Sequence, residues 1–222
     1  MLLAASTNSP SLSSTWPIPV ALVLLLAASV WVFRMLVRRW TTRRHWLDLS
    51  RWAESHRMKI LGAESATVPP VLATVTRPRP TASISIVSNT LEIAQMHTRK
   101  EERTDSSQFI RWHVLVRQTG LRWPPTGLRA RANASSILDL YPLTSYPSMA
   151  PPERFVIFGT DSAAARRISK SSMMALLPPD IGVLLHGSSM ILDFTARPFD
   201  TIELSRLCEL AEQLVAHIPP LE

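Results

Sequence analysis

The sequence predicts an α+β protein whose N-terminal helix spans a membrane. Three observations lead to this fold class: an uncharged apolar run near the N-terminus, alternating apolar and polar residues in the middle of the chain, and short strands mixed with amphipathic helices toward the C-terminus. The chain has 222 residues, so the part after the apolar run is long enough for one domain with its own core.

The apolar run extends from Ile18 to Val37, and Ser29 and Arg34 are the polar residues within it. About 20 residues of α-helix rise roughly 30 Å, the thickness of a hydrocarbon core. Ser29 can bond back to the helix carbonyls, and Arg34 is close enough to the end to reach the headgroups. We therefore expect residues 16–39 to form a transmembrane helix.

A cluster of arginines follows the apolar run: Arg34, Arg38, Arg39, Arg43 and Arg44. Positive charge favours the cytoplasmic side of a membrane, so residues 1–15 are expected to form a short external tail. The domain is then cytoplasmic, and the arginines lie beside the anionic inner leaflet of the cell inner membrane. Trp16 and Trp40 border the span and suit its two interfaces.

Two alternatives to an anchor remain open. A secretory signal peptide carries its positive charge before the apolar run, whereas here the arginines come after it. A buried core helix of this length without a polar face is unusual in a domain of this size. The order of apolar and basic residues therefore favours the anchor.

The high pI, near 10.7, invites a nucleic-acid interpretation. The chain has 24 basic and 17 acidic residues, and five of the basic ones are the arginines up to Arg44, where there are no acidic residues. Residues 45–222 therefore carry 19 basic and 17 acidic residues, a net charge of +2. Because the basicity belongs largely to the anchor, we expect no nucleic-acid partner.

No Pro or Gly occurs between Pro19 and Gly62, so the helix is expected to continue as a juxtamembrane helix over residues 40–61, to about Met58. A break is expected at Thr41-Thr42. The expected apolar face consists of Trp46, Leu49, Ala53 and His56.

Residues 62–222 are expected to form the soluble α+β domain. In its first half we expect strands over residues 71–75, 81–87, 91–97 and 109–117, with a hairpin turn at Ser88-Asn89-Thr90. Six prolines predict a Pro-rich loop over residues 119–152.

The C-terminal third predicts the order β-α-β-β-α, which is ferredoxin-like in part, with helices on one side of a mainly antiparallel sheet. The expected elements are a strand over 154–159, a helix capped by Thr160 or Asp161, a hairpin of 181–186 and 189–195, and a last helix from Asp200. The hairpin turn is expected at Gly187-Ser188.

No sequence motif identifies a catalytic, cofactor or metal site. His186, Ser188, Ser189 and Asp193 resemble a relay in composition, but their spacing on one hairpin favours a structural role. Cys208 is expected to be a buried, inert thiol. Asn133-Ala134-Ser135 fits a glycosylation sequon, which a cytoplasmic domain would not use.

His97 and His113 could face each other on neighbouring strands, with Glu92 or Asp105 as a third metal ligand. Two histidines without a fixed third ligand favour a structural interpretation instead.

Three segments carry a resemblance: LDLSRWAESHRMKIL after the apolar run, ERFVIFGTDSAAA, and DIGVLLHGSSMILDF with LSRLCELAEQLVAHIP. In this layout the chain resembles uncharacterised single-pass bacterial membrane proteins with one soluble α+β domain. The resemblance implies no activity. We expect a membrane-anchored, non-enzymatic domain that binds a protein partner as a scaffold or regulator. The alternative is a membrane-tethered enzyme with an unfamiliar site.

Overall fold

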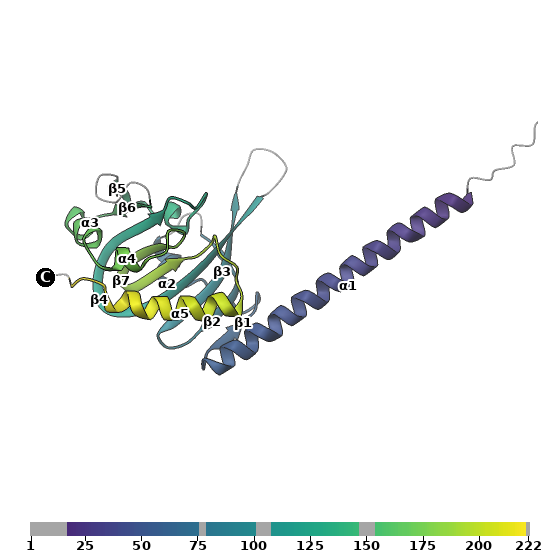
Figure 1. Cartoon of the computed structure of the whole chain (residues 1–222), viewed down its shortest axis with the longest axis horizontal. Helices are drawn as coiled ribbons and strands as arrows, with labels where there is room; N and C mark the ends of the chain where they lie inside the picture. The colour runs from purple at the N-terminus through teal and green to yellow at the C-terminus, as the bar shows by residue number, and fades with distance from the viewer. Residues whose placement is uncertain (1–16, 76–78, 101–107, 147–153, 221–222) are drawn as a thin grey trace, which may run out of the picture. The chain divides into compact units, whose positions relative to one another are not determined.

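The computed structural model describes residues 17–75, 79–100, 108–146 and 154–220 (Figure 1). The chain divides into two units, Met1–Leu47 and Asp48–Glu222, which we describe separately. The first contains most of helix α1 (Pro17–Ser55), and the second contains the sheet and the other helices. The α+β class and the mainly antiparallel sheet are confirmed.

Helix α1 runs without interruption through Thr41 and Thr42, so the expected break is absent. The hydroxyls of both threonines donate to carbonyl oxygens of the preceding turn, as does the hydroxyl of Ser29. These local bonds satisfy the polar groups without opening the helix. Among the residues that the structure describes, no helix is both long enough and apolar enough to cross a membrane. Trp16 lies outside the described residues.

The last two turns of α1 belong to the domain. Leu49, Trp52 and Ala53 are buried there, whereas His56 is exposed and stacks on the Trp52 ring. The indole Nε1 of Trp52 donates to Ser205 Oγ at 2.8 Å. The expected apolar face was therefore correct for two of its four members and missed Trp52. The helix ends at Ser55 rather than near Met58, and a strand follows.

The sheet has seven strands: β1 (Lys59–Leu61), β2 (Thr81–Val87), β3 (Leu91–Lys100), β4 (Gln108–Ala130), β5 (Thr144–Tyr146), β6 (Phe155–Gly159) and β7 (Gly182–Asp193). Along one edge of β4, its first half pairs with β3 and its second half pairs with β6. Strand β7 pairs along most of its other edge. Because β6 and β7 are both antiparallel to β4, they are parallel to each other with one strand between them, a split β-α-β arrangement.

Two predictions about strands were wrong. Gly187 has φ of +57° and bends β7 without reversing it, so the expected C-terminal hairpin is one long strand and the order is β-α-α-β-α. Strand β4 continues to Ala130 through Pro124 and Pro125, because two register shifts against β7 take the prolines out of the regular ladder. The Pro-rich loop therefore begins later than expected. The turn at residues 88–90 is confirmed.

Helices α1, α3 (Ser162–Ser169), α4 (Met173–Leu176) and α5 (Thr201–Ala216) pack into one hydrophobic cluster with one face of the sheet. Figure 1 shows α5 lying across the strands. The carboxylates of Asp161 and Asp200 cap α3 and α5 by accepting from backbone N–H groups, as expected. The apolar side of α5 consists of Leu204, Leu207, Ala211 and Leu214.

A second hydrophobic cluster covers the opposite face of the sheet. It includes Leu72 from the short helix α2 (Pro70–Val75) and Ile137 from the 3-10 helix η1 (Ile137–Leu140). Residues 71–75 were expected as a strand, and the helices were expected on one side only. Both expectations were wrong, since residues 70–75 form a helix and helices lie on both faces of the sheet. Strands β3 and β4 bury side chains on both faces, so the second face also needs a cover.

Candidate functional site

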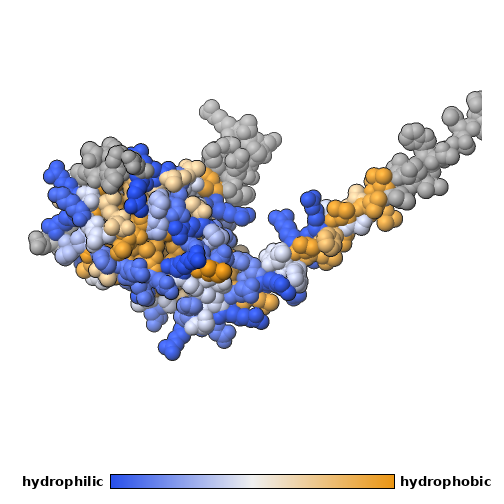
Figure 2. Space-filling model, in the orientation of Figure 1, coloured by the Kyte–Doolittle hydropathy of each residue, from blue (hydrophilic) through white to orange (hydrophobic). Residues whose placement is uncertain are grey.

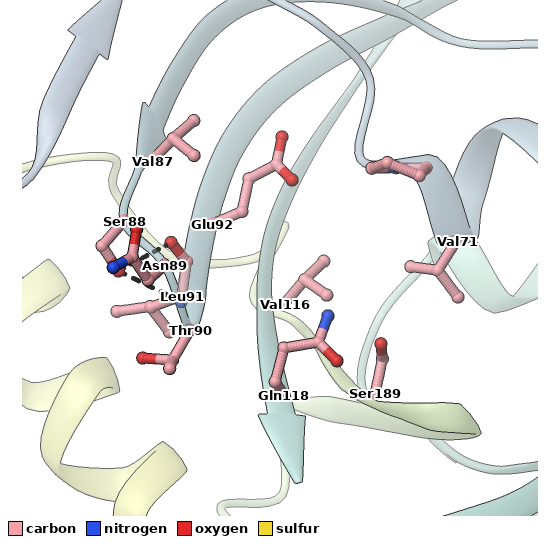
Figure 3. Close-up of a pocket in the computed structure, with 11 residues that line it drawn as sticks. Val71, Val87, Ser88, Asn89, Thr90, Leu91, Glu92, Val116, Gln118 and Ser189 are labelled. Atoms are coloured by element: carbon pink, nitrogen blue, oxygen red, sulfur yellow. Dashed lines mark hydrogen bonds between the residues drawn. The ribbon is translucent and has the colours of Figure 1, made fainter. Parts of the chain in front are cut away.

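The candidate site is a pocket beside the β2–β3 hairpin, on the face of the sheet that α2 covers. It encloses 310 Å³ and is lined by eleven residues (Figure 3). Pro70 and Val71 of α2 form one wall, and the hairpin turn forms another. Figure 3 shows the Glu92 carboxyl, the Val116 side chain and the Gln118 amide around the same hollow. Its volume is at the lower end of the range for small-molecule sites.

Strand register brings these residues together from distant parts of the chain. Glu92 of β3 lies between Val87 of β2 and Val116 of β4. Two residues further along β4, Gln118 pairs with Ser189 of β7. Two valines therefore flank Glu92 on the neighbouring strands, and the polar pair of Gln118 and Ser189 lies beside them. Glu92 contributes a carboxyl group to the described lining of the pocket.

Glu92 is half-buried, and the structure records no hydrogen bond or ion pair for its carboxyl group in the described part of the chain. Burial raises its pKa from 4.5 to about 7. The carboxyl is consequently about half ionised at neutral pH. A partly buried carboxyl with a raised pKa in a pocket is typical of binding and catalytic sites, although it also occurs elsewhere.

The other polar groups of the pocket are neutral. The Gln118 Oε1 atom accepts a hydrogen bond from Ser188 Oγ at 3.2 Å. Ser189 is buried, and its position on β7 places it beside Gln118. Ser88 closes the hairpin turn, since its backbone N–H donates to Leu91 O and its Oγ accepts from Leu91 N–H. The turn is thus held by its own hydrogen bonds.

Basic residues lie on the other side of the hairpin turn, where they line a separate hollow. His56, Arg57 and Lys59 lie around a neighbouring surface depression that shares the hairpin turn with the pocket. Lys59 is opposite Val87 in β1. Arg117, next to Val116, interacts with Thr90 Oγ1 and with Glu212. Among the residues that the structure describes, no Lys, Arg or His lines the Glu92 pocket.

The four residues that suggested a relay do not form one. His186 and Asp193 are seven positions apart on β7, which corresponds to roughly 20 Å of strand. The Asp193 carboxylate accepts hydrogen bonds from Ser136 Oγ, Ile137 N–H and Thr195, and so fixes η1 against the end of β7. Burial lowers the pKa of His186. The structural interpretation made from the sequence agrees with these contacts.

His97 and His113 do not face each other. Register places Arg111 opposite His97 and Gln95 opposite His113. Both ring nitrogens of His113 are engaged, Nδ1 with Arg197 O at 2.9 Å and Nε2 with the Gln95 side chain at 3.1 Å. Burial lowers the pKa of His113. The described residues contain no group of three His, Cys, Asp or Glu side chains that could hold a metal ion, and Asp105 lies outside them.

The surroundings of Cys208 and Asn133 indicate structural roles for both residues. Burial raises the pKa of the Cys208 thiol to about 11, so it is protonated at neutral pH. The Nδ2 of Asn133 donates to the backbone oxygen of Asp180 at 2.9 Å, and the residue is buried.

An ion-pair network was not anticipated from the sequence. The Arg197 guanidinium donates to both carboxylate oxygens of Asp180, at 2.6 and 2.8 Å, and to Glu203 Oε1 at 2.5 Å. These bonds raise the pKa of Arg197 and lower that of Asp180. The backbone oxygen of Arg197 also holds His113, so the network joins the loop before α5 to β4. Its acceptors come from separate loops and helices, which no local pattern reveals.

The arginines expected to orient the chain are all exposed on α1: Arg34, Arg38, Arg39, Arg43 and Arg44. The Arg44 guanidinium lies 3.7 Å from the centroid of the Trp40 ring, a cation–π geometry. Arg38, Arg39 and Arg43 line a groove along the helix that also has apolar lining from Met35 and Trp46.

The chain matches no protein-family model, no curated protein and no solved structure. Its function therefore has to be argued from the geometry of its own residues.

Proposed function

We propose that this protein is a single-pass membrane-anchored protein of the cell inner membrane, whose cytoplasmic α+β domain binds a protein partner in a scaffold or regulatory role. One observation carries the membrane-anchor part of the proposal. The large apolar side chains between Val23 and Val37 are between 42% and 71% exposed. A lipid bilayer is the environment that removes such a surface from water.

The exposed apolar residues occupy all sides of α1 rather than one stripe. Leu24, Leu25 and Leu26 are consecutive, as are Trp31, Val32 and Phe33. Consecutive helical residues point about 100° apart, so no single protein surface could cover them all. Figure 2 shows mostly orange, apolar surface on the described N-terminal part of the helix and more blue, polar surface toward its C-terminal part. The apolar run of the sequence also extends back to Ile18.

The orientation follows from the arginines. Arg38, Arg39 and Arg43 and the stacked Arg44 lie at the C-terminal side of the apolar surface. The positive-inside rule then places the domain in the cytoplasm and the N-terminal tail outside. The groove beside Met35 and Trp46 combines positive charge with apolar lining, which suits the headgroup region of an anionic leaflet.

A pair of reporters tests the topology. Fused after Glu222, a fluorescent protein that matures only in the cytoplasm should be active, and alkaline phosphatase should be inactive. The opposite pattern contradicts the orientation.

Affinity capture tests partner binding. Capture of the full chain from detergent-solubilised membranes should repeatedly recover the same protein, and this protein should be lost when the domain is deleted. Repeated recovery of no specific protein contradicts the binding role.

A further inference from the structure

The Glu92 pocket has a composition that selects its ligand. We propose that this pocket binds a small alkyl primary ammonium ion, whose charged head pairs with Glu92 and whose alkyl chain contacts the valines of the pocket. The inference goes beyond the membrane anchor and stands independently of it, because every lining residue belongs to the domain unit.

The charge of the ligand follows from the charge of the pocket. Glu92 is half-buried beside Val87 and Val116 and has no recorded partner within the described residues. An unpaired carboxylate in apolar surroundings is costly, and a bound cation offsets that cost. Because none of the described residues that line the pocket is Lys, Arg or His, an anionic ligand would find no counter-charge there and would be repelled by Glu92.

The head group follows from the acceptors near Glu92. An ammonium group has three N–H donors and no acceptor. Ser189 contributes a hydroxyl oxygen, and Gln118 contributes an amide oxygen that already accepts from Ser188 and retains a second lone pair. Figure 3 shows the Glu92, Gln118 and Ser189 side chains bordering one hollow. The Glu92 carboxylate, the Gln118 amide and the Ser189 hydroxyl line the same pocket, and a compact ammonium does not need a planar arrangement of acceptors.

The size and the alkyl chain follow from the rest of the lining. The pocket volume of about 310 Å³ is near the lower bound for small-molecule sites, which suits a small ligand. Val71, Val87 and Val116 provide apolar contact for a short chain. The hairpin turn and α2 enclose the chain on two sides. A multiply charged amine would place its second charge against these valines without a counter-charge, so it should bind more weakly.

The proposal is tested by calorimetric titration of the full chain in detergent micelles with n-butylammonium chloride at about pH 8, where Glu92 is ionised. Saturable binding with a dissociation constant of about a millimolar is expected for a ligand of this size. n-Butanol has the same chain without the charge and should bind at least about tenfold more weakly. Equal affinity for the alcohol contradicts the proposal, and so does the absence of amine binding.

Two variants locate the binding. Glu92→Gln keeps the size and removes the charge, and should weaken butylammonium binding at least about tenfold. Glu209→Gln removes an exposed carboxyl of α5 and should leave binding unchanged. Removal of a partly buried, unpaired charge does not destabilise the fold, so Glu92→Gln should remain folded by circular dichroism. Unchanged binding by Glu92→Gln contradicts the assignment.

The pH dependence gives a second measure. At about pH 6 Glu92 is about nine-tenths protonated, so wild-type affinity should fall about tenfold from its value at about pH 8. The neighbouring groups that face Glu92 from β4, β7 and α2 are Val116, Gln118, Ser189 and Val71, none of which titrates. Lys59 and Arg117 are not among the residues that line the pocket. A pH-independent affinity contradicts the role of Glu92.

A lysine side chain offers the same alkylammonium chemistry. A capped tripeptide with a central lysine is therefore titrated beside a matched norleucine tripeptide. Binding of the lysine peptide as tightly as butylammonium supports a protein side chain as the source, and binding of butylammonium alone supports a free amine. If neither compound binds, the proposal fails. This outcome is independent of whether the chain is anchored in a membrane.

Discussion

The two ends of helix α1 place similar side chains in opposite surroundings. Trp31 is 65% exposed, whereas Trp52, six turns later, is 8% exposed and hydrogen-bonded to Ser205. Leu25 is 71% exposed, whereas Leu49 is fully buried. The residue types are the same, so the difference lies in what surrounds them. The C-terminal end of α1 packs against α5 and the sheet. We propose that the other end is surrounded by lipid.

The largest expected effect comes from placing charge in the exposed apolar half. Leu25→Arg combined with Phe33→Arg should move the protein from the membrane pellet to the soluble or degraded fraction. Each arginine at the centre of a span costs about 2.5–3.5 kcal/mol of insertion free energy. Sedimentation and immunoblotting measure the change. Ile202→Arg, at an exposed apolar position of α5, is the matched control and should stay in the pellet.

Truncation of Trp52 tests the buried half. Trp52→Ala should lower the free energy of unfolding of the domain by about 3–5 kcal/mol, because it opens a cavity and removes the partner of Ser205. Chemical denaturation of the detergent-solubilised chain, followed by circular dichroism, measures this. Trp31→Ala should leave domain stability unchanged. Equal losses for the two tryptophans would remove the distinction between the two ends.

The pH dependence of the free energy of unfolding should come from the domain, since the apolar half of α1 has no acidic residue. Burial raises the pKa of Glu92 from 4.5 to about 7 in the folded state, so its ionisation lowers the stability of the fold progressively between these two pH values, and the full loss is present above about pH 7. Glu92→Gln should therefore be more stable than wild type by about 1–2 kcal/mol at about pH 8, a value reduced for its partial exposure. The difference should disappear as pH falls from about 7 to about 4.5. A constant difference across this range contradicts the raised pKa.

The smallest expected effect concerns the hydrogen bond between α1 and α5. Ser205→Ala should reduce the free energy of unfolding by about 0.5–1.5 kcal/mol, because the Trp52 indole N–H loses its acceptor. Thr41→Ala, whose hydroxyl bonds only within the exposed part of α1, should not change it. A double mutant of Trp52 and Ser205 should lose less than the sum of the single losses.

Local patterns predicted the elements that depend on local chemistry. The turn at Ser88, the strands on either side of it and the capping by Asp200 were all expected from short stretches of sequence. The prolonged helix after the apolar run was expected from the lack of Pro and Gly. Each of these elements is determined by propensity, periodicity or a cap within a few residues.

The errors arose where distant strands decide the backbone. Gly187 in β7 pairs with Trp123 of β4, beside a register shift, and the two strands bend together there. A glycine followed by a serine reads as a reversal when the partner strand is not known. Similarly, Pro124 and Pro125 suggested a loop, although irregular pairing with β7 accommodates them in a strand.

The candidate pocket was not predictable for the same reason. From the sequence, Glu92 was considered only as a third metal ligand beside His97 and His113. Strands β3 and β4 are covered on both faces, so the carboxyl lies in a pocket. Gln118 and Ser189 are 71 positions apart in sequence and meet only through strand pairing. No signal in the sequence joins these residues.

The most direct test of the membrane account is an alkaline carbonate wash of membranes from cells that express the unmodified full chain. Such a wash removes peripheral proteins and leaves spanning proteins in the bilayer. The account requires the full chain to remain in the pellet after the wash and to leave it only with detergent. Release of the intact chain into the carbonate supernatant would contradict the assignment of residues 16–39 as a membrane-spanning helix.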